Sequence, residues 1–360
     1  MFFQSKKTRI IIDPRSSYAY GSFYLYGLIQ IFGEQCVSYS MQPFKNLCHP
    51  GWNLRFIIIK NFKETKYFIH TNDTWKIQQQ DYDWCDVYGN VNANFTHCPK
   101  ERFPKLVSLV PSFGISVFNT SKTMLLAIGN FLKAKEDILK QECWNKYDNC
   151  MEINYRKNIK HFFGKYYKTS INRMRYENYK NDENSVEDYV FFLSTLWYSN
   201  EENKNDEGVN LRRAWFIRSC KSIPNINFAG GLVGDTTSSV NKFADVAAER
   251  GIPMPEWIAQ TKKSSFVFNT PAFWDCHGWK LGEYLALGKC ILSNPLSNDL
   301  PAPLVKGINI HYAEPTPEAI DDAVKYLVSN PEYRNKLEKG AQQYWDKYGT
   351  PIESLKLLGI

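Results

Sequence analysis

The sequence predicts an α/β protein with two doubly wound domains, each a parallel sheet between helices. Three observations support this prediction. The 360 residues are enough for two ordinary domains. Short apolar runs that read as buried strands alternate with helix-like segments in both halves of the chain. Residues 176–188 are rich in Asn, Asp, Glu and Lys without apolar periodicity, which is typical of a solvated linker.

This linker sets the expected domain organisation. We expect an N-terminal domain over residues 1–182 and a C-terminal domain over residues 189–345. A last helix over residues 346–360 is expected to pack back onto the N-terminal domain.

The first half contains five strand candidates and a long helical region. We expect strands at residues 9–13, 36–39, 56–59, 67–70 and 84–88, joined by crossovers in a parallel sheet. A helix follows the first strand and ends near Phe32, and the pattern over residues 123–175 is largely helical.

The second half repeats the same alternation. We expect strands at residues 189–193, 226–230, 266–268, 290–292 and 308–311. Helices are expected at residues 211–220, 240–250, 255–263 and 279–287. Thr316-Pro317 and Asn330-Pro331 each mark a further helix start, because a capping side chain precedes a proline at the first helical position.

Charge and composition narrow the function classes. The net charge of +7 is a mild excess that suits an anionic ligand or an anionic surface. It comes without a nucleic-acid-binding motif or a long basic block, so we expect no nucleic-acid partner. The nine cysteines lack CxxC spacing, which indicates a reducing, cytoplasmic location and no metal site. We recognise no signal peptide and no apolar run long enough to cross a membrane.

One strand, loop and helix near residue 280 has the pattern of an anion site. The loop over residues 269–277 follows a strand and contains Asn269 and His277. The helix after it begins near Gly278, where free backbone N–H groups favour an anion. Lys280 and Glu283 are three residues apart and share a face. A lysine there can neutralise a diphosphate, and a carboxylate can accept hydrogen bonds from ribose hydroxyls.

The same segment resembles a known enzyme family. Asp275 and Glu283, eight positions apart, are followed by Tyr-Leu-Ala-Leu-Gly-Lys-Cys-Ile-Leu up to Leu292. This resembles the donor-site signature of the glycosyltransferase group 1 family, which usually has two Glu at this spacing. The resemblance covers roughly residues 189–350 and implies the GT-B fold, with two Rossmann-like domains facing a cleft. It implies that Glu283 binds the ribose, that Asp275 faces the donor sugar, and that neither metal nor cofactor is required.

Each of these residues also has an ordinary structural interpretation. Glu283 can be a solvent-facing helix carboxylate paired with Lys280, and Asp275 can cap the helix. His277 and Asn269 can be loop and turn residues without a ligand.

Three further positions of the second half are donor-site candidates. Arg212 and Arg213 open a helix after a strand, where the resemblance implies a diphosphate clamp. The alternative for both is a solvated helix face. Gly231 belongs to a glycine-rich turn that would let backbone approach the base or the ribose, although it does not match GxGxxG.

The first half contributes candidates for acceptor binding and for a general base. Asp13 and Gly21 follow the first strand, and His70 and Asp73 lie at the end of another strand. An inverting transferase needs a base within reach of the acceptor hydroxyl, and His70, Asp73 or Asp13 has suitable chemistry. A packed histidine is the alternative for His70.

Residues 156–175 combine basic and aromatic side chains and contain no Asp or Glu. Such a segment suits an anionic membrane surface, where lipid-linked acceptors are found, or a solvated basic helix. The sequence alone leaves both open.

These observations predict a glycosyltransferase that moves a sugar from a nucleotide-sugar to a glycan or lipid-linked acceptor in surface polysaccharide synthesis. We expect it in the cytoplasm or at the inner face of the membrane. The alternatives are a GT-B nucleotide-sugar 2-epimerase, a non-catalytic nucleotide- or glycan-binding protein and, more remotely, a GT-B fucosyltransferase using a GDP-sugar.

Overall fold

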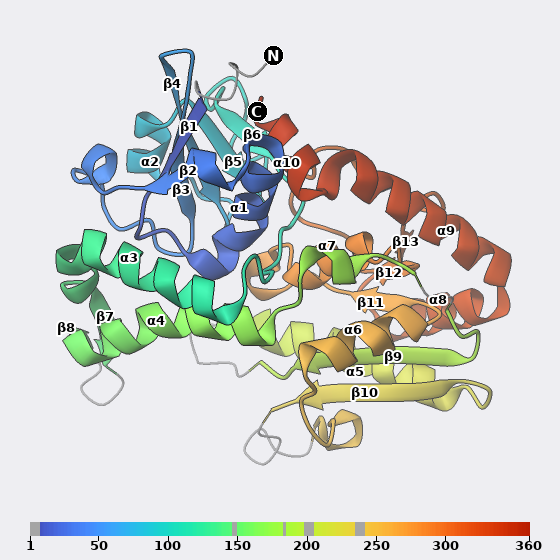
Figure 1. Cartoon of the computed structure of the whole chain (residues 1–360). Helices are drawn as coiled ribbons and strands as arrows, with labels where there is room; N and C mark the ends of the chain where they lie inside the picture. The colour runs from blue at the N-terminus through green and yellow to red at the C-terminus, as the bar shows by residue number, and fades with distance from the viewer. Residues whose placement is uncertain (1–7, 146–149, 183–184, 198–204, 235–241) are drawn as a thin grey trace. The chain divides into compact units, whose positions relative to one another are not determined.

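The protein is a mixed α/β structure in which parallel strand pairs predominate. The computed structural model describes residues 8–145, 150–182, 185–197, 205–234 and 242–360 (Figure 1). The chain divides into two compact units. Unit 1 contains residues 1–72, 76–176 and 351–360, and unit 2 contains residues 73–75 and 177–350.

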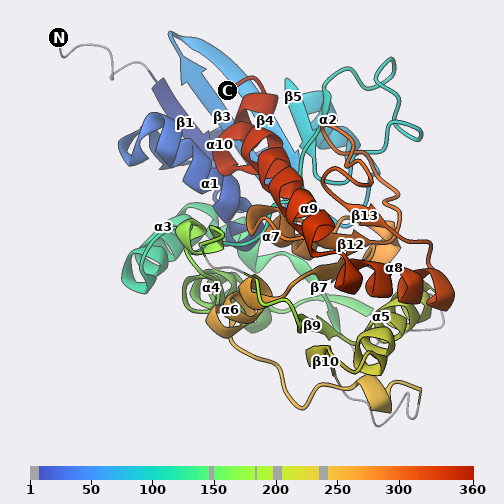
Figure 2. The ribbon, with the colours of Figure 1, turned by 90° about the vertical axis from the view of Figure 1, so that its right-hand side faces the viewer.

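Unit 1 is built on a six-stranded sheet of order β2-β1-β3-β4-β5-β6. Its strands are β1 (Thr8–Ile12), β2 (Val37–Tyr39), β3 (Leu54–Lys60), β4 (Lys63–His70), β5 (Val87–Asn90) and β6 (Leu106–Ser108). Helices α1 (Tyr18–Phe32) and α2 (Gln79–Trp84) lie on opposite sides of this sheet, as Figures 1 and 2 show. The sheet is therefore wound on both faces.

Strand β3 departs from the all-parallel sheet expected from the sequence, because it runs antiparallel to both β1 and β4. Strands β3 and β4 form a hairpin in which Lys60 pairs with Lys63. The two turn residues, Asn61 and Phe62, have φ values of 51° and 66°. Two positive φ angles in a two-residue turn match the twist of a hairpin, so the crossover predicted here is wrong.

A helical hairpin and a C-terminal helix complete unit 1. Its remaining elements are α3 (Thr120–Leu139), β7 (Glu142–Asn145), β8 (Cys150–Ile153), α4 (Tyr155–Asn172) and α10 (Pro351–Leu357). Strands β7 and β8 pair with each other and interrupt the region that the sequence presents as largely helical. Helix α10 packs on α1 so closely that a Cβ atom at Gly27 would lie 2.6 Å from the carbonyl oxygen of Pro351.

In its described residues, unit 2 has five parallel strands in two short sheets, β10-β9 and β11-β12-β13. The strands are β9 (Tyr189–Thr195), β10 (Asn227–Val233), β11 (Val267–Asn269), β12 (Ile291–Ser293) and β13 (His311–Tyr312). The start of β9 is joined to the segment that leads into β11 by a hydrogen bond from the backbone N–H of Ser265 to the carbonyl of Tyr189. The spatial order is therefore β10-β9-β11-β12-β13, which is the 2-1-3-4-5 order of one doubly wound class.

The helices of unit 2 cover both sides of these strands. They are α5 (Asn205–Ser222), α6 (Met254–Lys263), α7 (Trp279–Ala286), α8 (Pro317–Ser329) and α9 (Pro331–Tyr344). Figures 1 and 2 place α5 and α6 on opposite sides of β9. The N-cap predicted at Thr316 is confirmed, because its hydroxyl accepts a hydrogen bond from the backbone N–H of Ala319.

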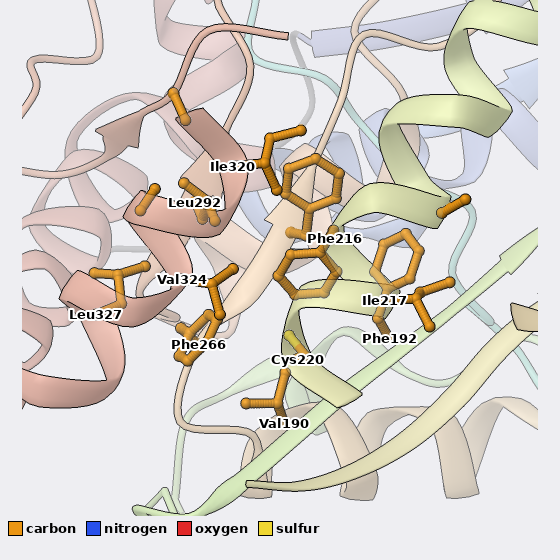
Figure 3. Packing of buried hydrophobic residues seen from close by; sticks show 14 of the residues in the cluster. Val190, Phe192, Phe216, Ile217, Cys220, Phe266, Leu292, Ile320, Val324 and Leu327 are labelled. Atoms are coloured by element: carbon orange, nitrogen blue, oxygen red, sulfur yellow. The ribbon is translucent and has the colours of Figure 1, made fainter. Parts of the chain in front are cut away.

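The core of unit 2 lies between the strands and helices α5 and α8 (Figure 3). Phe216 of α5 stacks on Phe268 of β11, with ring centroids 4.5 Å apart. Phe192 of β9 meets both rings edge-on. Ile320 and Val324 of α8 belong to the same buried cluster. Offset aromatic pairs of this kind add to the burial of apolar area and fix the strand ends that precede the candidate site.

The helix expected over residues 240–250 is not formed in its described part. Residues 242–250 contain only a short 3-10 turn, Ala244–Val246. The backbone N–H of Ala248 instead donates to Leu232 of β10, and Ala247 forms a parallel bridge with Leu232. Pairing with the strand therefore replaces helical hydrogen bonding in this segment.

Candidate functional site

A cavity of about 350 Å³ lies at the carboxyl ends of β9 and β11 in unit 2. In the order β10-β9-β11-β12-β13, the connections leave in opposite directions on either side of the β9–β11 boundary. The crevice at such a switch point is where doubly wound sheets bind ligands. The size is also within the range of small-molecule sites. The cavity is lined by Phe192, Leu193, Ser194, Thr195, Trp197, Arg213, Val233, Gly251, Ile252, Phe268, Asn269, Thr270, Ala272, Gly278, Trp279 and Lys280.

Two cations face this cavity, and both are held by backbone carbonyls at the end of β9. The ammonium of Lys280 donates to the carbonyl of Leu193 at 2.7 Å and lies 4.7 Å from the ring centroid of Phe192. The guanidinium of Arg213 donates to the carbonyl of Thr195 at 2.8 Å. These contacts fix both charges in position before any ligand arrives.

The electrostatics of the pair favour an anionic ligand. Burial lowers the pKa of Lys280 well below its ordinary value, and repulsion from Arg213 lowers it further, while Glu283 acts in the opposite direction. The residue as a whole is only half-buried, so it is the ammonium end that is enclosed. Two desolvated cations that repel each other are stabilised by a bound anion.

Helix α7 presents its N-terminus to the same cavity through Gly278 and Trp279. The helix is fixed in place by its apolar face, since Leu281, Tyr284 and Leu285 are buried and Tyr284 stacks on Trp257 of α6. The first N–H groups of a helix have no partner within it and add positive potential to an anion site.

Glu283 lies one turn beyond Lys280 on α7 and is only 4% exposed. The interpretation of Glu283 as a solvent-facing carboxylate is therefore wrong. Burial lowers the pKa of Lys280 and raises that of Tyr284, and the charge of Glu283 opposes the first shift and adds to the second. Glu283 does not belong to the residues that line the cavity. Its expected contact with a ribose stays a prediction, and in the described structure its charge acts on Lys280.

The other loop candidates divide between the cavity and its surroundings. Asn269 lines the cavity, and its side-chain amide donates to the hydroxyl of Ser293 at 2.9 Å. His277 is buried beside the cavity-lining Gly278. Asp275 is exposed and has a φ of 57°, and its backbone carbonyl accepts from Asn298. Asp275 and the preceding Trp274 both have positive φ, so the backbone of this loop is strained.

Arg212 is partly buried next to Arg213 but is not part of the cavity lining. Burial lowers its pKa, and the charge of Asp275 acts in the opposite direction. Its Nε atom makes no hydrogen bond to the residues that the structure describes. Of the two arginines predicted as a diphosphate clamp, the cavity therefore contains Arg213.

Asp73 belongs to unit 2, where its carboxyl group lies at the thiol of Cys276. Partial burial raises the pKa of this carboxyl, although the residue as a whole is exposed. A raised carboxyl pKa is closer to the value that a general base needs near neutral pH. Its role as a general base stays a prediction.

Asp13 in unit 1 is held by two arginines. Its oxygens accept hydrogen bonds from Arg15 and from Arg55 at 2.9–3.0 Å, and its side chain is fully buried. Arg55 also pairs with Asp81. A carboxylate that solvent does not reach and that two guanidiniums occupy is badly placed to take a proton from a substrate. The described contacts give Asp13 a structural role in joining β1 to β3.

His70 at the end of β4 is also completely buried. Neither ring nitrogen has a hydrogen-bond partner among the described residues. Burial lowers the pKa of the ring to about 3. These surroundings match the packed histidine that the sequence left as the alternative.

Two glycines predicted near ligands are needed for packing. Gly231 has a φ of 147°, and a Cβ there would lie 2.6 Å from the carbonyl oxygen of Val246. It therefore lets the segment after residue 242 lie beside β10. Gly21 on α1 faces Leu54, whose Cδ1 would be 3.2 Å from an added Cβ. Both contacts are within the protein.

The sequence did not point to Thr270, Trp197 or Trp279, which line the cavity beside the predicted residues. Trp279 is adjacent to Lys280, and Thr270 follows Asn269. Their positions at a helix start and at a strand end are therefore the sequence features that could have identified them. Within the described residues no group of three His, Cys, Asp or Glu side chains has an arrangement that would hold a metal. None of the seven cysteines with described side chains forms a disulfide.

No family model and no curated protein matches this chain. Solved structures that it resembles include the C-terminal domain of a glycosyl transferase group 1 family protein, LpcC, from Francisella tularensis. That match has 13% identity and a TM-score of 0.31, covering 46% of this chain and 87% of the other. The chain is also similar to a UDP-GlcNAc 2-epimerase from Neisseria meningitidis bound to UDP-GlcNAc, with 11% identity and a TM-score of 0.39 over 78% of this chain and 62% of the other.

A third similar structure is Anabaena HepE in complex with UDP and glucose, with 8% identity and a TM-score of 0.40 over 80% of this chain and 69% of the other. The chain thus spans less than two thirds of the length of the epimerase. The fold assignment of unit 2 rests on its own strand order and parallel pairing.

Proposed function

We propose that this protein is a glycosyltransferase whose nucleotide-sugar donor binds in the cavity at the β9–β11 switch point. The observation that carries the proposal is the pair Lys280 and Arg213, two fixed cations facing one cavity at the N-terminus of α7. A diphosphate has the negative charge to accept hydrogen bonds from both. The resemblance of residues 275–292 to a donor-site signature supports the same ligand.

The cation pair also suits the chemistry. In glycosyl transfer the bond between the anomeric carbon and the diphosphate oxygen breaks, and the nucleoside diphosphate leaves with an additional negative charge. Lys280, Arg213 and the N–H groups of α7 stabilise that charge as it develops. The acceptor hydroxyl forms the new bond to the anomeric carbon and loses its proton. In this proposal Glu283 holds the ribose and supports Lys280, and Asp275 faces the sugar.

For an inverting reaction we assign the proton to Asp73, because its carboxyl pKa is raised while its residue stays exposed. The acceptor that we propose is a glycan or a lipid-linked sugar, taken up in the cytoplasm or at the inner face of the membrane. No metal or cofactor enters this scheme, and the nucleotide-sugar is a substrate.

The test is calorimetric titration of UDP, GDP, CMP, dTDP and their sugars into wild type, Lys280→Met, Arg213→Met and Glu283→Ala. One nucleotide family should bind wild type. Each of the substitutions Lys280→Met and Arg213→Met should raise the dissociation constant of the nucleoside diphosphate by about tenfold to a hundredfold. This is the loss expected when one charge-assisted hydrogen bond to phosphate is removed. Lys306→Met is the matched control, because Lys306 is an exposed lysine of unit 2 that does not line this cavity.

Thermal melts of each variant establish that it folds. Lys280→Met and Arg213→Met each remove one of the two positive charges, so they test the site independently. Unchanged affinity in both folded cation variants would contradict the donor site. Conversion of a nucleotide-sugar to its epimer, without release of the nucleoside diphosphate, would contradict the transferase reaction while leaving the site in place.

A further inference from the structure

Helix α3 of unit 1 exposes a stripe of large aliphatic side chains. Leu125, Ile128 and Leu132 are 69%, 47% and 69% exposed and follow one another at a spacing of three and four residues. The opposite side of the helix is buried through Thr123, Ala127, Asn130, Ala134 and Ile138. A helix on the surface of a soluble domain ordinarily carries polar residues where this one carries leucine. A contiguous exposed apolar stripe marks an interaction surface.

Helix α4 exposes positive charge. It contains Arg156, Lys157, Lys160, Lys165 and Lys168 and has neither Asp nor Glu. All of these except Lys165 are exposed. Tyr155, Ile159, Tyr167 and Ile171 of the same helix are also exposed, so apolar and cationic side chains alternate on its surface.

The two helices form one antiparallel hairpin, and Figure 1 shows them side by side. The side-chain amide of Asn130 donates to the hydroxyl of Tyr166 at 3.0 Å near the middle of the pair. The side-chain amide of Asn158 donates to the carbonyls of Leu139 and Gln141 where the helices are joined. These contacts place the aliphatic stripe and the cations on one compact body.

The short strands between the helices extend the apolar surface. Met151 and Ile153 of β8 are large apolar residues that are also exposed. They lie at the end of the hairpin where α3 and α4 are connected.

We propose that the α3–α4 hairpin docks on the surface of an anionic lipid bilayer. Leucine and isoleucine side chains enter the boundary between headgroups and acyl chains, and the lysines and arginines bind the anionic headgroups. The charge complementarity selects this occupant, because a second copy of the same basic hairpin would meet it with like charge. Within the described residues no helix is long and apolar enough to cross a membrane.

The experiment is co-sedimentation of the full chain with vesicles of phosphatidylcholine alone, or of phosphatidylcholine and phosphatidylglycerol in equal parts, without nucleotide. Wild type should bind the mixed vesicles and not those of phosphatidylcholine. The double variant Lys157→Gln with Lys160→Gln should reduce the partition coefficient about 30-fold. Each basic residue near an anionic surface contributes a factor of about 5 to the partition coefficient, and two are removed. Leu125→Ser with Leu132→Ser should reduce it at least about tenfold, because two apolar side chains no longer insert.

The matched control is Ile308→Ser with Lys306→Gln, an exposed apolar and cationic pair in unit 2, which should bind as wild type does. Absence of binding to the mixed vesicles, or equal binding to both kinds, would overturn the proposal. So would light scattering that shows a dimer dissociated by the leucine substitutions, since the stripe would then belong to a second copy. Because no donor is present, these outcomes are independent of the cavity in unit 2.

Discussion

Replacing His70 by leucine should make the protein less sensitive to acid. The imidazole is fully buried, both ring nitrogens lack hydrogen-bond partners among the described residues, and burial lowers its pKa to about 3. In the unfolded chain the ring has an ordinary pKa of 6.5. As the pH falls below 6.5, His70 binds a proton in the unfolded chain, whereas in the folded chain it does so only near pH 3. The stability at neutral pH is therefore lost progressively through that window.

The size of the effect follows from this difference in proton binding. One proton changes the free energy of unfolding by about 1.4 kcal/mol per pH unit. Between pH 7 and pH 5 His70 should therefore lower the free energy of unfolding by about 2 kcal/mol. At pH 7 the substitution itself should cost little, because leucine fills similar space and no hydrogen bond is lost.

The assay is urea unfolding followed by circular dichroism at pH 7 and pH 5, for wild type and His70→Leu. Other groups, such as His49, whose pKa burial lowers to about 4, contribute equally to both proteins and cancel in the comparison. If the two units unfold separately, the transition that the substitution moves is that of unit 1. Equal loss of stability in both proteins would show that folded His70 takes up protons normally. The reasoning from burial would then be refuted, and His70 would return as a base candidate.

Two further predictions concern unit stability. Gly230→Ala should destabilise unit 2 by more than about 2 kcal/mol, because the residue has a φ of 105° and its new Cβ would lie 2.1 Å from the carbonyl oxygen of Phe192. Gly129→Ala in α3, where nothing lies within 4 Å of an added Cβ, should instead stabilise the protein by about 0.5–1 kcal/mol. Equal shifts of the melting temperature in the two variants would contradict the steric argument. Lys289→Met should cost about 3–5 kcal/mol by leaving the largely buried carboxylate of Glu338 without the ammonium 3.5 Å away. Adding Glu338→Leu should recover most of that loss in chemical denaturation, and no recovery would show that the pair is not coupled.

The strand positions of unit 2 could be predicted because buried parallel strands are short apolar runs between turn residues. Phe266, Phe268 and Leu292 all proved to be core residues. The cavity could also be anticipated, since it lies where a strand ends and the next helix begins. The pattern selects Lys280, Asn269 and Gly278 on those grounds, and all three line the cavity. Arg213 also lines it, but the expectation that this residue opens its helix is wrong, because α5 begins at Asn205 and Arg213 lies in its middle. Their roles toward a donor stay predictions.

The remaining features depend on contacts that one sequence does not encode locally. The β3–β4 turn is built from Asn61 and Phe62 without the glycine that usually marks such a turn. The helical pattern after residue 240 gives way to pairing with Leu232, which is a tertiary contact. The burial of Asp13 likewise depends on Arg55, which is 42 positions away along the chain. The sequence alone therefore does not distinguish a carboxylate that is buried in an ion pair from one that can bind a ligand. The three-dimensional structure is needed for that distinction.

Unit 1 is completed by residues 351–360, whose helix α10 fits against Gly27 of α1. During synthesis these residues leave the ribosome after every residue of unit 2. Unit 1 therefore cannot reach its final packing before residues 351–360 have been made, and the face of α1 that receives α10 stays uncovered until then. A chain cut after residue 176 would carry that bare face permanently, so expression of unit 1 by itself calls for a linker that returns residues 351–360 to it.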